Sequence, residues 1–338
     1  MLFPVQASRS AVSMVAALLS LLFSTHAQDL PRPAVTDLAW AGATPELKVR
    51  LAGLEENVKI AVAANDLRSQ ALALDRIGAL YFTHKNASQA LKYFQQVLPI
   101  VRKLKQRTAE ATALSDIGAA NFALGRPEDA LDAFKLALPI WREVGNHDHE
   151  AATLGDIGEV FRALNDQEEA LHFDQQALPL YVLAGNHDGQ AAVLNNIGLV
   201  YYASHDKKRA LDTFQKAFEM YRSSMNLAGQ AQTLNNIGGT YNELKNPRKA
   251  IEQFQQAIPI LREMGDRKGE ATALNNLASA FSRLGDDKRA LEYYQQAEEA
   301  FRDAGDESNE RAVIRNINQL YADLRSSASK ADPQKSFP

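Results

Sequence analysis

Apolar residues recur along this chain with a fixed period of 40 residues and with helical spacing inside each period. In one copy, Leu154, Ile157, Gly158 and Phe161 follow the spacing i, i+3, i+4, i+7, which places them on one face of an α-helix. A second helical pattern with its own apolar face follows in each copy. We call the first pattern A and the second B. Because each pair buries its apolar face only against its neighbours, the period predicts an array of stacked helix pairs.

Polar residues and glycines mark the expected helix ends. A column between A and B holds five good N-cap residues and one arginine: Asn86, Arg126, Asp166, Asp206, Asn246 and Asp286. Glycines suited to a left-handed C′ position follow four of the B patterns, at Gly145, Gly185, Gly265 and Gly305. Such short connections predict that successive helices are antiparallel.

The pattern also predicts the layout of the chain. Arg9, an apolar run from Ala11 to Phe23 and small residues after it are typical of a secretory signal. We therefore expect export, to the periplasm or out of the cell. The run is too short to span a bilayer comfortably, so no membrane span is expected after cleavage, with an uncleaved anchor as the alternative. The predicted regions are a signal peptide at 1–27, a linker at 28–43, an N-terminal capping helix at 44–65, six 40-residue units at 66–310, a C-terminal capping helix at 311–324 and a disordered tail at 325–338.

Composition and charge exclude several classes of function. Of the 338 residues, 46% are apolar, and the net charge of −4 comes with no basic stripe, so no nucleic-acid partner is expected. The absence of cysteine excludes thiolate metal ligands and a cysteine nucleophile. The sequence has no Gly-rich phosphate loop, metalloprotease helix or nucleophile motif, so we predict neither an enzyme nor a cofactor.

One family signature matches the repeat position by position. The matching residues of one copy are Leu194, Ile197, Gly198, Tyr201, Ala210, Phe214 and Ala217. The chain thus resembles the tetratricopeptide-repeat family over roughly residues 70–325, in the 40-residue long-helix form found in kinesin light chains and in bacterial arrays that often end in a CHAT peptidase. The resemblance implies an all-α, right-handed superhelical solenoid of antiparallel helix pairs. It also implies a concave surface, lined mainly by A helices, that binds a peptide or protein partner.

The resemblance places the binding residues just off the apolar face of each A helix. Three consecutive asparagine pairs lie there and would form a ladder of amides, whose donors and acceptors suit a peptide backbone. The predicted partner-binding residues are Asp116, Asp156, Glu159, Arg162, Asn195, Asn196, Tyr202, Asn235, Asn236, Asn242, Asn275 and Asn276. In the alternative interpretation, the asparagines only bond neighbouring helices and stabilise the stack. The acidic residues suit a basic ligand segment, or form a solvated face.

Three functions fit this sequence. We expect an exported, non-catalytic scaffold; the alternatives are a substrate-recruiting subunit of a separate peptidase system and a small-molecule or cell-wall receptor. The sequence does not indicate the oligomeric state.

His147, His149 and His187 lie in equivalent loops but match no metal motif, so a solvated turn is favoured and no metal site is predicted. Asp174 occupies a column of aromatic residues, so either Phe173 fills the gap or Asp174 reaches solvent or a basic partner.

Overall fold

The computed structural model describes residues 44–331, with side chains described to residue 326. The predicted signal peptide, the predicted linker at 28–43 and residues 332–338 of the predicted tail lie outside the described residues. Within 44–331 the chain forms fourteen α-helices and no strand. None of these helices is both long enough and apolar enough to cross a membrane. The described part is therefore all-α, as the repeat pattern predicts.

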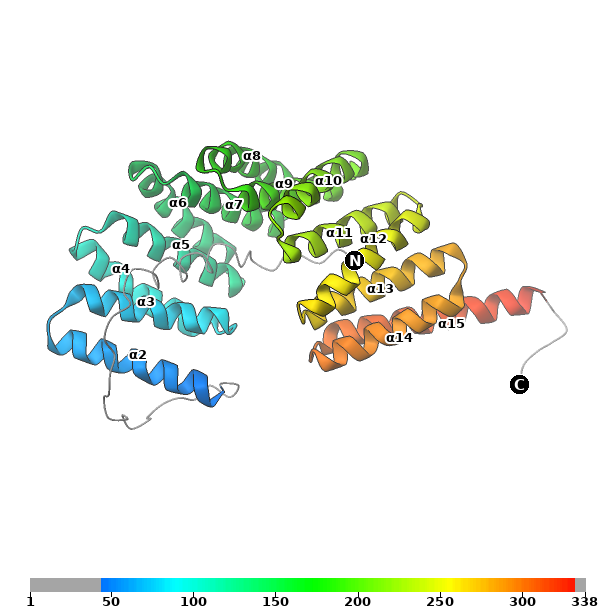
Figure 1. The fold of residues 1–338 in the computed structure, drawn as a ribbon, viewed down its shortest axis with the longest axis horizontal. Coiled ribbons are helices and arrows are strands. Elements are labelled where there is room, and N and C mark those ends of the chain that lie inside the picture. The colour runs from blue at the N-terminus through cyan, green and yellow to red at the C-terminus, as the bar shows by residue number, and fades with distance from the viewer. Residues whose placement is uncertain (1–43, 332–338) are drawn as a thin grey trace. The chain divides into compact units, whose positions relative to one another are not determined.

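The helices fall into two compact units, divided between Gly189 and Gln190. Antiparallel neighbours stack within each unit (Figure 1). In the N-terminal unit the helices are α2 (Pro45–Ala63), α3 (Leu67–Thr83), α4 (Ala87–Lys103), α5 (Arg107–Ala123), α6 (Pro127–Glu143), α7 (His147–Ala163) and α8 (Gln167–Ala184). The C-terminal unit follows with α9 (His187–Ala203), α10 (Lys207–Ser223), α11 (Leu227–Glu243), α12 (Pro247–Glu263), α13 (Arg267–Leu284), α14 (Asp287–Asp303) and α15 (Glu307–Ala331). Odd-numbered helices are the A helices, and even-numbered ones are the B helices.

Every connection between helices contains one residue in the left-handed conformation. These residues recur every 20 positions, and six of them are glycines with φ between 65° and 82°. The other seven are Asn65, Lys85, Lys105, Asn165, His205, Met225 and Lys245. The predicted caps are confirmed: Asn86, Asp166, Asp206, Asn246 and Asp286 each accept a backbone N–H from their helix, whereas Arg126 makes no such bond. One turn geometry thus ends each helix from α2 to α14, with or without glycine.

Close contact between A and B explains the column of small residues at Gly78 and its equivalents. A Cβ atom placed on Gly198 would lie 2.5 Å from Cε1 of Phe214, and one on Gly238 would lie 2.6 Å from Cε1 of Phe254. Both phenylalanines are fully buried. The aromatic ring of B thus occupies the space that a side chain on A would need.

A helix lies at each predicted capping position, and the C-terminal one, Glu307–Ala331, extends past both ends of the predicted range 311–324. Thr44 caps α2 with its hydroxyl, 3.3 Å from the Leu47 N–H, and Pro45 takes the first helical position. At the other end, α15 continues to Ala331, so the first seven residues of the predicted disordered tail, 325–331, are helical. The prediction ended the helix at 324 because its apolar spacing stops there. A helix without breaking residues continues past its last packed turn.

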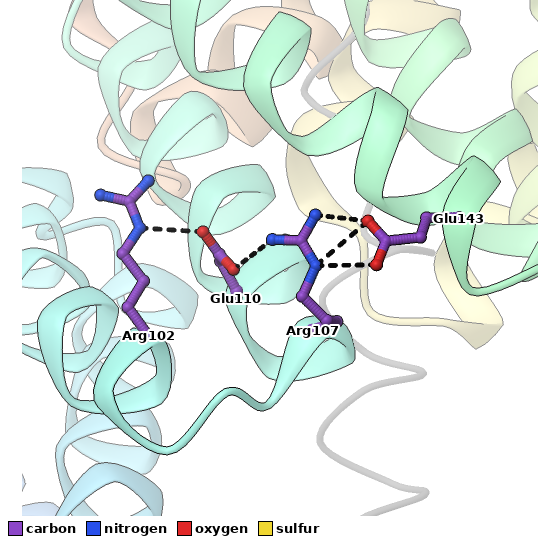
Figure 2. Close-up of polar contacts among 4 residues, drawn as sticks. All are labelled: Arg102, Arg107, Glu110 and Glu143. Atoms are coloured by element: carbon purple, nitrogen blue, oxygen red, sulfur yellow. Dashed lines mark hydrogen bonds and ion pairs between the residues drawn. The ribbon is translucent and has the colours of Figure 1, made fainter.

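Ion pairs link the last turn of a B helix to the first turns of the next A helix. Figure 2 shows one network, in which Arg102 Nε lies 2.8 Å from Glu110 Oε1 and Arg107 joins Glu110 to Glu143. Burial works to raise the pKa of Glu110, but the hydrogen bonds from Arg102 and Arg107 outweigh it and lower that pKa. The same arginine–glutamate pairing, eight residues apart, recurs as Arg142–Glu150, Arg262–Glu270 and Arg302–Glu310.

Candidate functional site on the A helices

Five of the predicted asparagines of the C-terminal unit, together with Asn316, form a hydrogen-bonded ladder across successive A helices. Asn236 Nδ2 donates to Asn195 Oδ1 at 3.0 Å, and Asn276 Nδ2 donates to Asn235 Oδ1 at 3.1 Å. Asn316 Nδ2 donates to Asn275 Oδ1 at 2.9 Å. Each bond joins residues 41 positions apart, from the first asparagine of one pair to the second of the next. We call this set the amide ladder.

The amide ladder is only partly accessible. Asn195, Asn236 and Asn276 are buried, with 3%, 8% and 9% of their surface exposed. Asn196, Asn235 and Asn275 are half-buried. Each bond uses one of an amide's two donors or part of its acceptor capacity, so both unpaired hydrogen-bonding groups and bonded ones lie along this face. The geometry therefore supports the stabilising interpretation directly and leaves amide groups for a ligand.

Carboxyl groups occupy the corresponding positions in the N-terminal unit. Asp75 on α3 and Asp116 on α5 are separated by the same 41 positions as a bonded amide pair, and Asp156 on α7 follows. All three are half-buried. Among the described residues none of the three makes a hydrogen bond or an ion pair, although Arg76 attracts Asp75 electrostatically. We call these three residues the acidic column.

Loss of solvent raises the pKa of every carboxyl in the acidic column. Burial raises the pKa of Asp75 to about 6 against the attraction of Arg76. For Asp116, burial and then the charges of Asp75 and Asp156 hold the pKa well above its usual range. Burial, with a contribution from Glu159, raises the pKa of Asp156 to about 8. Although each carboxyl keeps some contact with solvent, most of its surroundings are protein. At neutral pH Asp156 is therefore mostly protonated and Asp75 mostly ionised.

Glu159 and Arg162 depart from the prediction that they line an exposed groove. Glu159 is 8% exposed and the Arg162 side chain 11% exposed. Arg162 Nη1 lies 2.8 Å from Oδ2 of Asp174, which is completely buried. The reason is the replacement of the usual aromatic ring by Asp174: the smaller carboxylate needs a cation, and Arg162 turns inward to provide one. Phe173 does not fill the gap, because it stacks on Phe161 at 5.5 Å between ring centroids.

This buried cluster is not fully satisfied. Within the described part of the chain, Glu159 Oε1, Arg162 Nη2 and Asp174 Oδ1 are buried without a hydrogen-bond partner. Burial raises the pKa of Glu159 to about 7 against the attraction of Arg162. Burial also raises the pKa of Asp174 to about 7, again opposed mainly by Arg162. One guanidinium therefore serves two buried carboxyls, which is too little to keep both ionised easily.

The remaining predicted groove residues lie one turn further along the A helices of the C-terminal unit. Tyr202 is half-buried, with Lys207 Nζ 3.3 Å from its ring centroid, and burial, then Glu243, raises the pKa of Tyr202 to about 12. Asn242 is 7% exposed, and its Oδ1 has no partner in the described structure. Asn242 therefore contributes little accessible surface, whereas Tyr202 packs partly against the apolar cluster of Phe214 and Ile237 and keeps some exposure.

The histidine loops have structural contacts, and so has a column of aromatic residues near the ends of the B helices: Trp141, Tyr181, Tyr221 and Phe301. The His149 ring lies 4.6 Å from Trp141, measured between centroids, and Asn186 donates to Asp148 at 2.6 Å. Residues 44–326 contain no group of three or more His, Asp or Glu side chains arranged to hold a metal ion. The rings of Tyr181 and Tyr221 each lie against a glycine on the first turn of the following A helix, at Gly189 and Gly229. The aromatic column therefore packs one repeat against the next.

Two features of this region were missed or undervalued in the sequence. The arginine–glutamate bridges were missed, although an Arg eight residues before a Glu recurs with the 40-residue period. Asp75 belongs with Asp116 and Asp156, yet only the latter two were predicted as binding residues. Asp75 could have been recognised by its separation of 41 residues from Asp116. This separation became informative only when the structure showed that asparagines 41 residues apart bond one another.

Comparison with known proteins identifies the repeat. BtubC (BKLC) from P. vanneervenii is 22% identical over 66% of this chain and 93% of its own, with a TM-score of 0.57. A Rap protein complexed with competence and sporulation factor is 15% identical, covers 94% of this chain and 92% of its own, and has a TM-score of 0.55. The APC/C hetero-tetramer Cut9–Hcn1 is 17% identical over 80% of this chain and 46% of that chain, with a TM-score of 0.62.

These likenesses, all below 25% identity, concern the fold alone. No curated protein sequence matches the chain. The model of the tetratricopeptide repeat matches residues 109–181, 180–223 and 229–303, which together make up more than half of the chain. With the helix pairs and the glycine–aromatic contacts described above, this match shows that the chain belongs to the tetratricopeptide-repeat family.

Proposed function

We propose that this protein is a non-catalytic scaffold that binds a segment of a peptide or protein partner on the polar face of its A helices. The amide ladder is the observation that carries the proposal. Asn235 and Asn275 each accept one bond, remain half-buried and keep amide donors for a partner's carbonyl groups. A row of such groups matches the regular donors and acceptors of a peptide backbone.

Two of the structurally similar proteins support this class of function. One Rap protein is complexed with competence and sporulation factor, and Cut9 forms a hetero-tetramer with Hcn1. By analogy of fold, the present chain serves to bind a partner rather than to catalyse a reaction. The predicted signal at 1–27 supports a partner in the periplasm or outside the cell.

A substitution of Asn196 can test partner binding without disturbing the packing of the helices. Asn196 is half-buried and makes no hydrogen bond to the described residues, whereas Asn236, at the equivalent position of the next A helix, bonds Asn195. We expect Asn196→Ala to weaken binding of peptides selected from an array by about tenfold without changing the melting temperature. Asn236→Ala should lower both the affinity for these peptides and the melting temperature. Gln255→Ala, on the exposed surface of α12, is the matched control and changes neither. Selected peptides that bind all three variants like wild type would contradict the proposal.

A further inference from the structure

The carboxyls of the acidic column lie at positions equivalent to those of the amide ladder, but when ionised they have no hydrogen-bond donors with which to bond one another. Two amides can bond because each has both donors and acceptors, and the structure shows three such bonds between 2.9 and 3.1 Å. Two ionised carboxylates have only acceptors. Asp75 and Asp116 lie on successive A helices with the same 41-residue separation as the bonded asparagines. When both are ionised, this pair therefore needs a hydrogen-bond donor from elsewhere: either a bound proton or a cationic group.

A second observation points to a missing cation beside the column. Glu159 is more than nine-tenths buried, its Oε1 has no partner in the described structure, and its charge acts on Asp156. Arg162, the nearby guanidinium, bonds Asp174 instead. The charged groups that act on one another here are Asp75 and Arg76 from α3, Asp116 from α5, Asp156, Glu159 and Arg162 from α7, and Asp174 from α8. Five carboxyls thus face two guanidinium groups.

We propose that the acidic column, one helical turn from the buried Glu159, binds arginine or lysine side chains of a partner peptide or protein, whose N–H groups supply the donors that the column lacks. The inference rests on the proposed function and assigns the chemical class of ligand for the N-terminal unit. Guanidinium groups suit the site because they donate in pairs to carboxylates. A hydrophobic or acidic segment would leave the carboxyls desolvated and unpaired.

The spacing of the column suggests the spacing of the ligand. Packed helices lie about 8–10 Å apart, and an extended chain advances about 3.3 Å per residue. A cationic residue at every third position of an extended segment therefore meets successive carboxyls. The matched probe is an acetylated and amidated peptide of three Arg-Gly-Gly units, and its uncharged counterpart carries citrulline in place of arginine.

Binding of such a probe is coupled to loss of protons. Asp75 and Asp156 have pKa values raised to about 6 and about 8, and that of Asp116 is also raised, so the free column is partly protonated at neutral pH. A cation binds the ionised form and displaces those protons. Affinity therefore increases as pH rises through this range, and protons are released on binding.

Titration calorimetry at about pH 6 and about pH 8.5 tests the proposal at constant salt. We expect the arginine probe to bind about tenfold more tightly at the higher pH, to release protons, and to bind more tightly than the citrulline probe. Asp116→Asn with Asp156→Asn lowers the affinity about tenfold. The matched control, Asp129→Asn with Asp132→Asn, removes two exposed acids of α6 and leaves the affinity unchanged. Circular dichroism confirms that both variants are folded.

The outcomes separate this inference from the proposed function. Equal affinity for the arginine and citrulline probes, or an equal loss in the two double variants, overturns the assignment of a cationic ligand. If peptides selected on the array still depend on Asn196, the scaffold function stands and only the charge assignment fails. If neither probe nor selected peptides bind, both are wrong.

Discussion

The two units place different chemistry at equivalent positions of the same repeat. In the C-terminal unit, hydrogen bonds of about 3 Å between asparagine side-chain amides connect α9 to α11, α11 to α13 and α13 to α15. In the N-terminal unit, carboxyls on α3, α5 and α7 occupy the corresponding positions without hydrogen bonds. Amides are self-complementary and carboxylates are not. One backbone register therefore supports either a ladder of hydrogen-bonded amides or a column of carboxyls that needs protons or a cation.

One B helix departs from the others. Phe94 and Phe134 in the N-terminal unit, like Phe214 and Phe254 in the C-terminal unit, lie against a glycine of the preceding A helix, whereas Asp174 takes that place against Gly158. Replacing a ring by a carboxylate draws Arg162 out of the exposed face and into the core. A buried ion pair of this kind is weak evidence for stability, because desolvation offsets much of the attraction.

The largest effect is expected from Arg162→Ala. Removing the guanidinium leaves Asp174 buried without a cation, so the free energy of unfolding should fall by about 3–5 kcal/mol at pH 8. The loss should shrink at about pH 5, because protonated Asp174 needs no cation. Denaturation in urea at both pH values measures this. Adding Asp174→Phe restores the aromatic core of the other repeats and should recover most of the stability; no recovery would contradict the account of this core.

Converting the ladder into a carboxyl pair tests the comparison directly. Asn195→Asp with Asn236→Asp places two carboxyls where an amide bond now lies in a buried site, and should cost about 3 kcal/mol at pH 8 and much less at about pH 5. Asn236→Asp alone is the control: the Asn195 amide can turn and donate to the new carboxylate, so its cost is smaller. Thermal melts across this pH range decide the matter, and equal costs for single and double variants would show that donor complementarity is not what the ladder supplies.

Gly198→Ala should destabilise the protein by about 2 kcal/mol. Its new Cβ would lie 2.5 Å from the fully buried ring of Phe214, so the helices must separate or the ring must shift. Gly155→Ala is the matched control, because its Cβ meets nothing within 4 Å and alanine favours the helix. Chemical denaturation should therefore move the two variants in opposite directions. A stabilising effect of Gly198→Ala would disprove the close-approach role of this column.

The smallest effect concerns the pH dependence of the acidic column. A carboxyl with a raised pKa in the folded state binds protons that the unfolded chain has lost, so its contribution to stability is present at low pH and is lost as pH rises through about 6 to 8. Asp116→Asn with Asp156→Asn should remove part of this loss and exceed wild type by roughly 1 kcal/mol at pH 8, a value reduced by the partial exposure of both groups. Parallel melts of the variant and wild type measure the difference; a variant less stable than wild type at pH 8 would contradict it.

Local features of the sequence determined the helices and their order. N-caps such as Asn86 and Asp286, the left-handed Gly145 and the apolar spacing around Ile157 act within one or two turns, so they can be read from neighbouring residues. The fixed period then shows which residues are equivalent, which was enough to predict the paired helices and the row of asparagines. It did not show the end of α15, because the apolar spacing stops near residue 324 while the helix continues to Ala331, two residues before Pro333.

Partners across repeats were decided only by the tertiary structure. Whether Asn236 bonds Asn195, or Arg162 faces solvent or Asp174, depends on the offset between helices that lie apart in sequence. The same holds for the bridges from Arg102 to Glu110 and from Arg142 to Glu150. A repeat pattern specifies which positions are equivalent in successive repeats. The packing of one helix on the next decides which non-equivalent side chains come into contact, and a hydrogen bond forms only where that packing brings donor and acceptor within about 3 Å.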